Sequence, residues 1–155
     1  MHLPGGNPST RSLERIFLNI ETKARIAKKT PSQSLSPSVF LIDDSSDVRA
    51  FFEVVTAMEG MPLISARDGV DALAKLEALD GDPSVVFVDL NMPVMNGTEF
   101  LAKALERGLA KTSRIIVLSG ADRSSVNLDP NEVEWLQKPF ELGQILGLLS
   151  SLRTH

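Results

Sequence analysis

Five short apolar segments, each followed by a polar or charged residue, constrain the fold of this chain most strongly. They alternate with longer segments in which apolar residues recur every three to four positions. Short apolar runs indicate buried parallel strands, and the longer spacing indicates amphipathic helices. With right-handed crossovers, this alternation predicts an α/β fold, a doubly wound five-stranded parallel sheet with helices on both faces. The expected strands are 39–42, 63–65, 85–88, 114–118 and 133–137, and the expected helices are 45–59, 70–79, 97–107 and 142–152.

Each helical segment carries an apolar stripe that should face the sheet. The residues assigned to these inward stripes include Met58, Val70, Leu105 and Leu142. Residues 121–131 depart from the alternation, because they are poor in large apolar side chains and contain a proline. A short helix at about 122–127 has only weak support there.

Charge divides the chain near residue 37. Residues 1–37 hold six basic and two acidic side chains, a net charge of +4, whereas residues 38–155 hold ten basic and eighteen acidic ones, a net charge of −8. We expect a disordered start, an amphipathic basic helix at about 11–29 and a linker at 30–37, ahead of one domain at 38–155. The helix could form a homodimer, dock on a partner or bind an acidic surface, and a solvated arm is the alternative. Its apolar positions are Leu13, Phe17, Ile20, Ala24 and Ala27.

Composition excludes several classes of protein. The chain has no cysteine, so disulfides, zinc–thiolate sites and thiol nucleophiles are ruled out. No apolar run approaches the ~20 residues of a transmembrane segment, and the start lacks the apolar core of a secretory signal, so we expect a cytoplasmic protein. The net charge of −4 argues against direct DNA binding. No glycine-rich nucleotide-binding motif is present.

The polar residues that follow the strands give the first indication of function. Asp43 and Asp44 follow the first expected strand, Asp89 the third, Ser119 the fourth and Lys138 the fifth. The carboxyl ends of parallel strands line the crevice where open α/β sheets bind ligands. Three carboxylates in one place favour a hard cation such as Mg²⁺, and a lysine beside them favours an anion such as phosphate.

Five motifs in this order resemble the receiver domain of two-component response regulators, over about residues 38–152. The resemblance implies the flavodoxin-like form of the doubly wound fold. It is specific because five motifs occur in the right order with the right elements between them. The motifs are VFLIDDS at 39–45, ARDGVDAL at 66–73, DLNMPVMNG at 89–97, IVLSG at 116–120 and LQKPF at 136–140.

The resemblance implies that Asp89 is the phosphoacceptor, which takes a phosphoryl group from a phosphohistidine of a histidine kinase or a histidine phosphotransfer protein. A carboxylate that attacks phosphorus needs its repulsion from the phosphoryl oxygens cancelled, which a bridging metal can do. The plainer alternative is an aspartate that only ends a strand. The motif that follows Asp89 favours the phosphoacceptor.

The resemblance also implies a metal site for Mg²⁺, with Mn²⁺ as a substitute. Asp44 should bind the ion directly and Asp43 largely through water, while Asp89 adds a carboxylate oxygen and Asn91 its backbone carbonyl. Alternatively, Asp44 or Ser45 only caps the helix that follows. Two adjacent aspartates repel each other until a cation arrives, which favours the metal.

Further roles follow from the later motifs. Lys138 resembles the lysine that pairs with the phosphoryl oxygens, and Pro139 the family's cis-proline. Ser119 and the backbone N–H of Gly120 would bind the phosphoryl group. Trp135 stands at the switch aromatic, which moves as Ser119 is drawn toward the phosphate. Simple packing of Trp135 at the sheet edge is an equally weighted alternative.

We therefore expect a single-domain response regulator that signals by phosphorylation-dependent binding to an unknown downstream protein, and not a metabolic enzyme. Its acyl phosphate should hydrolyse slowly, with Asn91 and Ala121 flanking the attacking water. The alternatives are a receiver-like module that works without phosphorylation and, less favoured, an aspartate-nucleophile phosphohydrolase, which would need a second aspartate at position 91. Ser119 and Lys138 are nineteen positions apart, fewer than usual in the family, so the helix between them should be short, mobile or absent.

Overall fold

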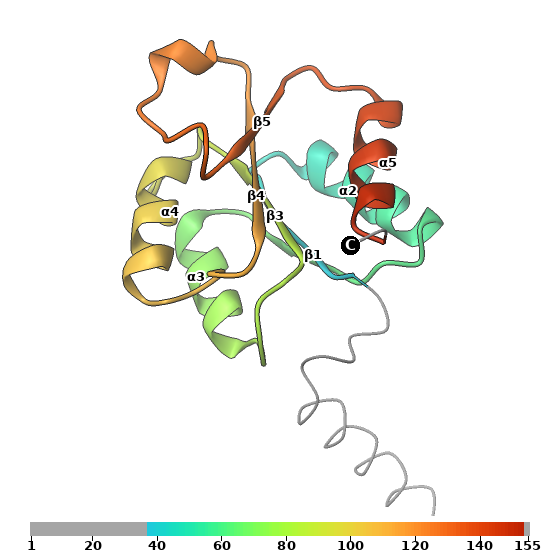
Figure 1. The fold of residues 1–155 in the computed structure, drawn as a ribbon, viewed down its shortest axis with the longest axis horizontal. Coiled ribbons are helices and arrows are strands. Elements are labelled where there is room, and N and C mark those ends of the chain that lie inside the picture. Colours follow the sequence, from blue (N-terminus) through green and yellow to red (C-terminus); the bar gives the residue numbers. More distant parts are fainter. Residues whose placement is uncertain (1–36, 154–155) are drawn as a thin grey trace, which may run out of the picture. The chain divides into compact units, whose positions relative to one another are not determined.

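The five predicted strands form one sheet in the computed structural model, which describes residues 37–153 (Figure 1). All neighbouring strands run parallel, in the order β2-β1-β3-β4-β5. The predicted doubly wound sheet is thus confirmed, and each element lies within one residue of its expected bounds. The strands are β1 (Val39–Ile42), β2 (Leu63–Ala66), β3 (Val85–Asp89), β4 (Arg114–Ser119) and β5 (Glu134–Gln137), and the α-helices are α2 (Ser46–Met58), α3 (Gly69–Ala78), α4 (Gly97–Glu106) and α5 (Leu142–Ser151).

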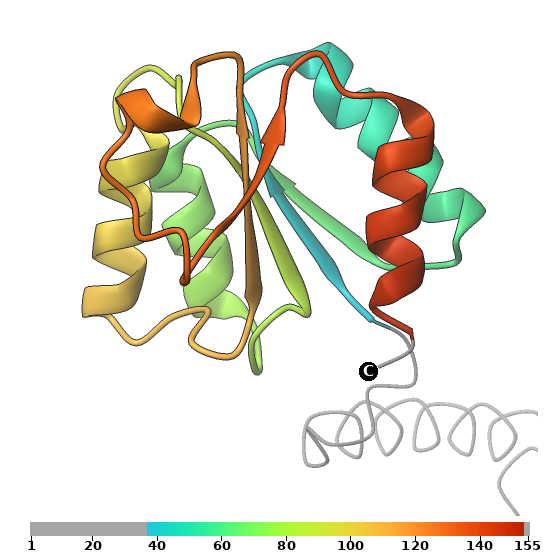
Figure 2. The ribbon, with the colours of Figure 1, turned by 45° about the horizontal axis from the view of Figure 1, so that its top comes forward.

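Two helices cover each face of the sheet (Figure 2). Successive strand residues point to opposite faces, so Phe40 and Val86 pack toward α3 and α4, while Leu41 and Phe87 pack toward α2 and α5. Every residue of β1 and β3 is buried. Central parallel strands covered on both faces lose water from both sides, which explains their continuous apolar sequence.

Side-chain caps fix where the helices begin. The Ser45 hydroxyl accepts a hydrogen bond from the Val48 N–H, and Asn96 caps α4 in the same way. The cap of α2 is therefore Ser45, which leaves Asp44 free of that role. Gly60, with φ +64°, follows the end of α2. No helix within residues 37–153 is long and apolar enough to cross a membrane.

Four apolar residues expected to face inward are exposed instead. Met58, Val70, Leu105 and Leu142 have exposed fractions between 45% and 63%. Each lies within two residues of a helix end. The sheet covers only the middle of each helix. The apolar stripe continues to the helix ends, where its outermost residues are exposed.

The connection between β4 and β5 contains no α-helix. A single three-residue 3-10 turn, η2 (Arg123–Ser125), is its only helical element, as the short spacing predicted. Val126, Leu128 and Val133 pack partly buried against the core on the α3 and α4 side. The predicted disordered start, the basic helix at 11–29 and nearly all of the linker lie outside the described residues.

Candidate functional site

Three aspartates meet at the carboxyl ends of β1 and β3. The parallel register places Ile42 opposite Val88, so the next residues along the chain, Asp43 and Asp89, become neighbours. One carboxylate oxygen from each of Asp43, Asp44 and Asp89 lies within 4.8 Å of the others. Asp43 is fully buried and Asp89 is 4% exposed, whereas Asp44 is exposed. The cluster is thus open to solvent on the Asp44 side.

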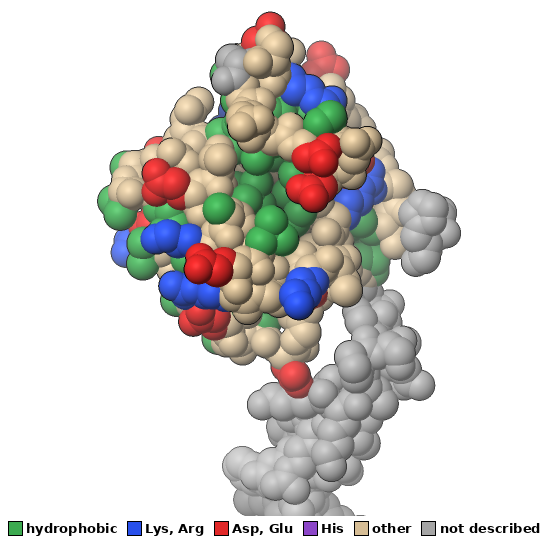
Figure 3. Space-filling view, turned by 60° about the vertical axis from the view of Figure 1, so that its left-hand side comes forward, with side chains coloured by type: hydrophobic (Ala, Val, Ile, Leu, Met, Phe, Trp, Pro, Cys, Tyr) green, Lys and Arg blue, Asp and Glu red, His purple; other side chains and the backbone are tan. Residues whose placement is uncertain are grey.

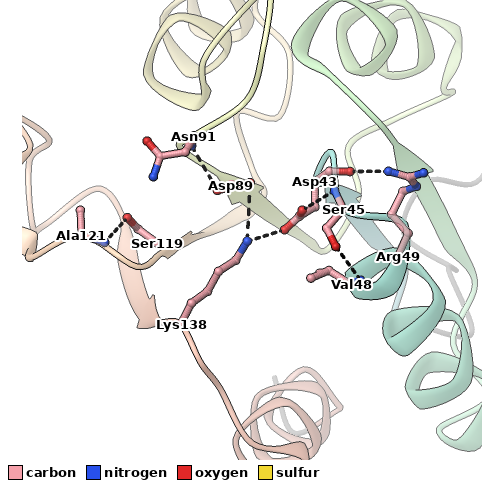
Figure 4. Close-up of polar contacts among 9 residues, drawn as sticks. All are labelled: Asp43, Ser45, Val48, Arg49, Asp89, Asn91, Ser119, Ala121 and Lys138. Carbon is pink, nitrogen blue, oxygen red and sulfur yellow. Dashed lines mark hydrogen bonds and ion pairs between the residues drawn. The ribbon is translucent and has the colours of Figure 1, made fainter.

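Lys138 reaches both buried carboxylates from the end of β5 (Figure 4). Its Nζ lies 2.9 Å from Asp43 Oδ2 and 3.5 Å from Asp89 Oδ2. The Lys138 N–H donates to the Ser119 carbonyl (2.8 Å), which joins the ends of β4 and β5. The peptide bond between Lys138 and Pro139 is cis, as the resemblance implied.

Backbone groups and one arginine hold the two buried aspartates in place. The Ser45 N–H donates to Asp43 Oδ1 (2.9 Å), and the Asn91 N–H donates to Asp89 Oδ1 (3.1 Å). The Arg49 guanidinium donates to the Asp43 carbonyl (2.8 Å) from the first turns of α2 (Figure 4). Sequence reasoning did not find Arg49, and its position six residues after Asp43 was the only signal available.

Burial and neighbouring charges shift the pKa values of Asp89 and Lys138. Burial raises the pKa of Asp89 to about 6, and the charges of Asp43 and Asp44 add to this rise, against the Asn91 N–H and Lys138. Burial disfavours the Lys138 ammonium, but the hydrogen bond and charge of Asp43, with the charge of Asp89, outweigh it and raise the pKa of Lys138. Negative charge is therefore in excess at this edge. Oxygen donors in such an excess fit a hard divalent cation.

Ser119 lies on the other side of Asp89 from Asp43 (Figure 4). It is fully buried, and its Oγ accepts the Ala121 N–H (3.0 Å). A hollow of about 410 Å³, lined in part by Asn91, Ser119 and Ala121, opens beside it. This hollow gives a small anion room beside Ser119 and Asn91.

Trp135 is the predicted site residue that stands apart from the aspartates. It is partly buried, and it packs with Val126 and Leu128 against the core under α3 and α4. This placement agrees with the packing alternative for the indole. It also leaves Trp135 two strand positions before Gln137, which pairs with Ser119.

Gly97 lets α4 begin against the end of β3. A Cβ at this position would lie 2.4 Å from the Asp89 carbonyl oxygen and 2.9 Å from the Leu90 Cα. The Gly97 N–H donates to the Leu90 carbonyl (3.1 Å). Only glycine fits this contact, so it sets the backbone position of Asp89.

Comparison with known proteins agrees with this geometry. A sequence profile described as the response regulator receiver domain matches residues 39–150. Protein PilG of Pseudomonas aeruginosa is 33% identical over 122 residues, which cover 77% of this chain and 89% of PilG. The transcriptional regulatory protein PrrA of Mycobacterium tuberculosis is 32% identical over 76% of this chain, and the match spans 50% of PrrA.

Solved structures give the same result. The chemotaxis protein CheY4 of Vibrio cholerae superposes with a TM-score of 0.66 at 28% identity, and covers 76% of this chain and 98% of CheY4. Residues 39–150, which the family profile matches, contain the whole sheet and the three aspartates. The chain therefore belongs to the response regulator receiver domain family of two-component signalling.

Proposed function

We propose that this chain accepts a phosphoryl group on Asp89 from a histidine kinase or a histidine phosphotransfer protein, in a Mg²⁺-dependent reaction. The observation that carries the proposal is the convergence of Asp43, Asp44, Asp89 and Lys138 at one edge of the sheet. Membership of the receiver family supports it. The phosphorylated form then signals by binding a downstream protein.

The reaction is a transfer from nitrogen to oxygen. An Asp89 carboxylate oxygen forms a bond to phosphorus as the bond between phosphorus and the donor imidazole breaks, and the imidazole leaves with its electron pair. Asp43, Asp44, Asp89 and the Asn91 carbonyl would hold Mg²⁺, or Mn²⁺, whose charge offsets the repulsion between carboxylate and phosphoryl oxygens. Lys138 exchanges its contact with Asp89 for a phosphoryl oxygen.

The new phosphoryl group is bound by donors on its far side. The Ser119 hydroxyl and the Gly120 N–H donate to its oxygens, and charge-assisted hydrogen bonds of this kind are the strong ones. Ser119 turns toward Asp89 to do so, which empties space on the β4 side. Trp135 moves into that space and changes the exposed surface near β5.

The acyl phosphate is removed at the same site. Asn91 and Ala121 line the hollow beside Ser119, so they flank the approach of a water molecule. This slow hydrolysis is the chain's own reaction on itself and not turnover of a separate substrate. A phosphohydrolase that uses an aspartate nucleophile has less support, because position 91 holds Asn in place of a general acid.

We further propose that residues 38–155 form the receiver domain, with residues 1–37 as an extension ahead of it. The match to 89% of PilG supports a receiver of this size. PrrA differs in this respect, because the match spans only 50% of its length. A cytoplasmic location is part of the proposal.

Intact-mass spectrometry tests the phosphoacceptor. The full chain is incubated with acetyl phosphate or phosphoramidate and Mg²⁺, and we expect the mass of one phosphoryl group to be added. Asp89→Asn should stay unmodified, while the control Asp80→Asn, at an exposed aspartate outside the five motifs, should react as wild type does. An unmodified wild type, or an Asp89→Asn variant that still gains the mass, would contradict the proposal.

Removal of divalent ions tests whether the phosphorylation reaction needs a metal. Removal of divalent ions with EDTA should abolish the mass increase, and added Mg²⁺ or Mn²⁺ should restore it. Asp44→Asn should need a higher Mg²⁺ concentration for the same yield, because it removes an exposed carboxylate of the cluster. Equal yields with and without EDTA would show that no metal is needed.

A further inference from the structure

A small polar pocket lies beside the carboxyl end of β2, the strand that borders β1 on the side away from β3. It has a volume of about 290 Å³, and its lining consists of Arg49, Ser65, Arg67, Asp71 and Lys75. These residues come from α2, β2, α3 and the turn between β2 and α3. All five are polar and three are basic, so we call this site the basic pocket.

Positive charge is in excess in the basic pocket. Three basic side chains and one acidic side chain give its lining a net charge of +2, whereas residues 38–155 as a whole have a net charge of −8. On the face of the domain shown in Figure 3, most basic side chains lie beside acidic ones. The pocket is thus a place where an acidic domain presents the opposite sign of charge, and a concave site of this kind attracts anions.

The one acidic residue of the pocket pairs with its lysine. Lys75 Nζ lies 3.2 Å from Asp71 Oδ2, and it donates to the Ser65 carbonyl (2.7 Å). Within residues 37–153, neither Arg49 nor Arg67 takes part in an ion pair. Two guanidinium groups therefore line the pocket without a carboxylate bound to them in the described part of the chain.

Arg49 is fixed at the pocket by a single hydrogen bond. It is half-buried, and its guanidinium donates to the Asp43 carbonyl (2.8 Å; Figure 4). A guanidinium has five N–H donors, so this bond leaves others for a ligand. Arg67 and Lys75 are exposed, and a ligand can therefore reach the pocket from solvent.

The basic pocket is distinct from the place where a phosphoryl group on Asp89 would lie. The Asp43 N–H donates to the Ala66 carbonyl (3.1 Å), which joins the ends of β1 and β2. Asp89 ends β3, on the other side of β1. Two strand spacings, about 10 Å, separate β2 from β3, so the two sites can be occupied independently.

We propose that Arg49, Arg67 and Lys75 bind a phosphate group in the basic pocket. A dianionic phosphate matches the net charge of +2 of the lining. Guanidinium groups bind phosphate oxygens through paired N–H donors, and a lysine adds a point charge beside them. The proposal does not depend on phosphorylation of Asp89.

Titration of the full chain with potassium phosphate, followed by NMR, tests the proposal. The sample contains EDTA, so that no divalent ion draws phosphate to the aspartate cluster. We expect saturable shifts of the side-chain Nε–H signals of Arg49 and Arg67, without a comparable shift at the backbone N–H of Gly120. Potassium chloride at the same ionic strength should leave these signals in place, because it only screens charge. Equal shifts with chloride and phosphate, or a shift at Gly120 alone, would overturn the proposal.

A matched pair of exposed arginines separates the pocket from a general attraction of anions. Arg67→Gln should weaken phosphate binding by roughly tenfold, because it removes a charge-assisted contact. Arg123→Gln changes an exposed arginine on η2, outside the pocket, and should bind phosphate as wild type does. Thermal unfolding checks that both variants are folded. An affinity of Arg67→Gln equal to that of wild type would overturn the proposal.

Two ligands show whether free phosphate or a phosphomonoester is recognised. Inorganic phosphate and glycerol 3-phosphate are titrated separately, and we expect similar affinities, because the polar lining offers no apolar contact to the organic group. Tighter binding of glycerol 3-phosphate would also support the site and would assign it to a phosphomonoester. The absence of saturable binding for both ligands would overturn the proposal.

Discussion

The aspartate edge of the sheet and the connection from β4 to β5 differ in how they are held. At the edge, Asp43 and Asp89 are buried and bound by backbone N–H groups and by Lys138. Within residues 37–153, no buried side-chain nitrogen or oxygen lacks a hydrogen-bond partner. The connection is mostly exposed, and its backbone hydrogen bonds join residues two to four positions apart.

The difference shows which parts of a receiver the sheet determines. Parallel register fixes the ends of β1, β3 and β5, so the residues that follow those strands must converge. The connection pairs with no strand, and its length can change without moving these residues. The site is therefore fixed by the core, while the neighbouring surface is free to differ between relatives. The predictions below test this contrast, from the largest expected effect to the smallest.

Gly97→Ala should have the largest effect, because the new Cβ meets the backbone of Asp89 and Leu90 at 2.4–2.9 Å. We expect a loss of about 3 kcal/mol in the free energy of unfolding, measured by urea denaturation. Gly147→Ala is the control, since nothing lies within 4 Å of its Cβ in the middle of α5. It should stabilise by about 0.5–1 kcal/mol. If Gly97→Ala and Gly147→Ala change the free energy of unfolding equally, the backbone at the aspartate edge is not packed more tightly than the middle of α5.

Asp89→Asn should stabilise the protein at neutral pH. The pKa of Asp89 is raised from 3.8 to about 6, so between these values the folded state holds a proton that the unfolded state has lost. Wild-type stability therefore falls as pH rises through this window and is then level. We expect the variant to match wild type near pH 4 and to exceed it by about 2 kcal/mol above pH 7, without divalent ions.

Urea denaturation of both proteins from pH 4 to pH 8 measures this difference. Added Mg²⁺ should narrow it at high pH, because the cation binds the wild-type carboxylates more tightly. A difference that is the same at pH 4 and pH 8 would show that Asp89 ionises normally.

Val94→Gly should stabilise by about 1 kcal/mol. Val94 lies within the motif at 89–97, with φ +69° and 86% exposure, and a β-branched residue is strained in this region. Val70→Gly is the opposite case, since Val70 is also exposed but lies in α3. It should destabilise by about 0.5 kcal/mol. Thermal or urea unfolding measures the stability of both variants. A loss of stability in both would show that the backbone of Val94 is not strained.

An insertion of Gly-Ser-Gly after Asn127 should have the smallest effect. The connection there has few long-range hydrogen bonds, and a longer loop costs only about 0.6 kcal/mol per doubling. Phosphorylation measured by intact mass should be unchanged. A large loss of stability or of phosphorylation would show that the connection supports the site.

Sequence patterns predicted the sheet because the strands are apolar on both faces, and they predicted the cluster because its residues directly follow those strands. Contacts made by long side chains could not be predicted in this way, and Arg49 reaching the Asp43 carbonyl is one example. Val94 was also beyond local reasoning, because backbone preferences disfavour valine at positive φ. The exposure of Met58 depends on where the sheet stops, which no periodicity encodes.

The bond from Lys138 to the fully buried Asp43 carries a last consequence. An uncompensated carboxylate in this position would oppose burial of the β1 end. Lys138 serves as a counter-ion for Asp43 that is part of the chain itself and does not have to be bound from solution. Folding of the domain therefore does not require a cation at the site, and under the proposed mechanism removal of divalent ions would stop phosphorylation without unfolding the domain.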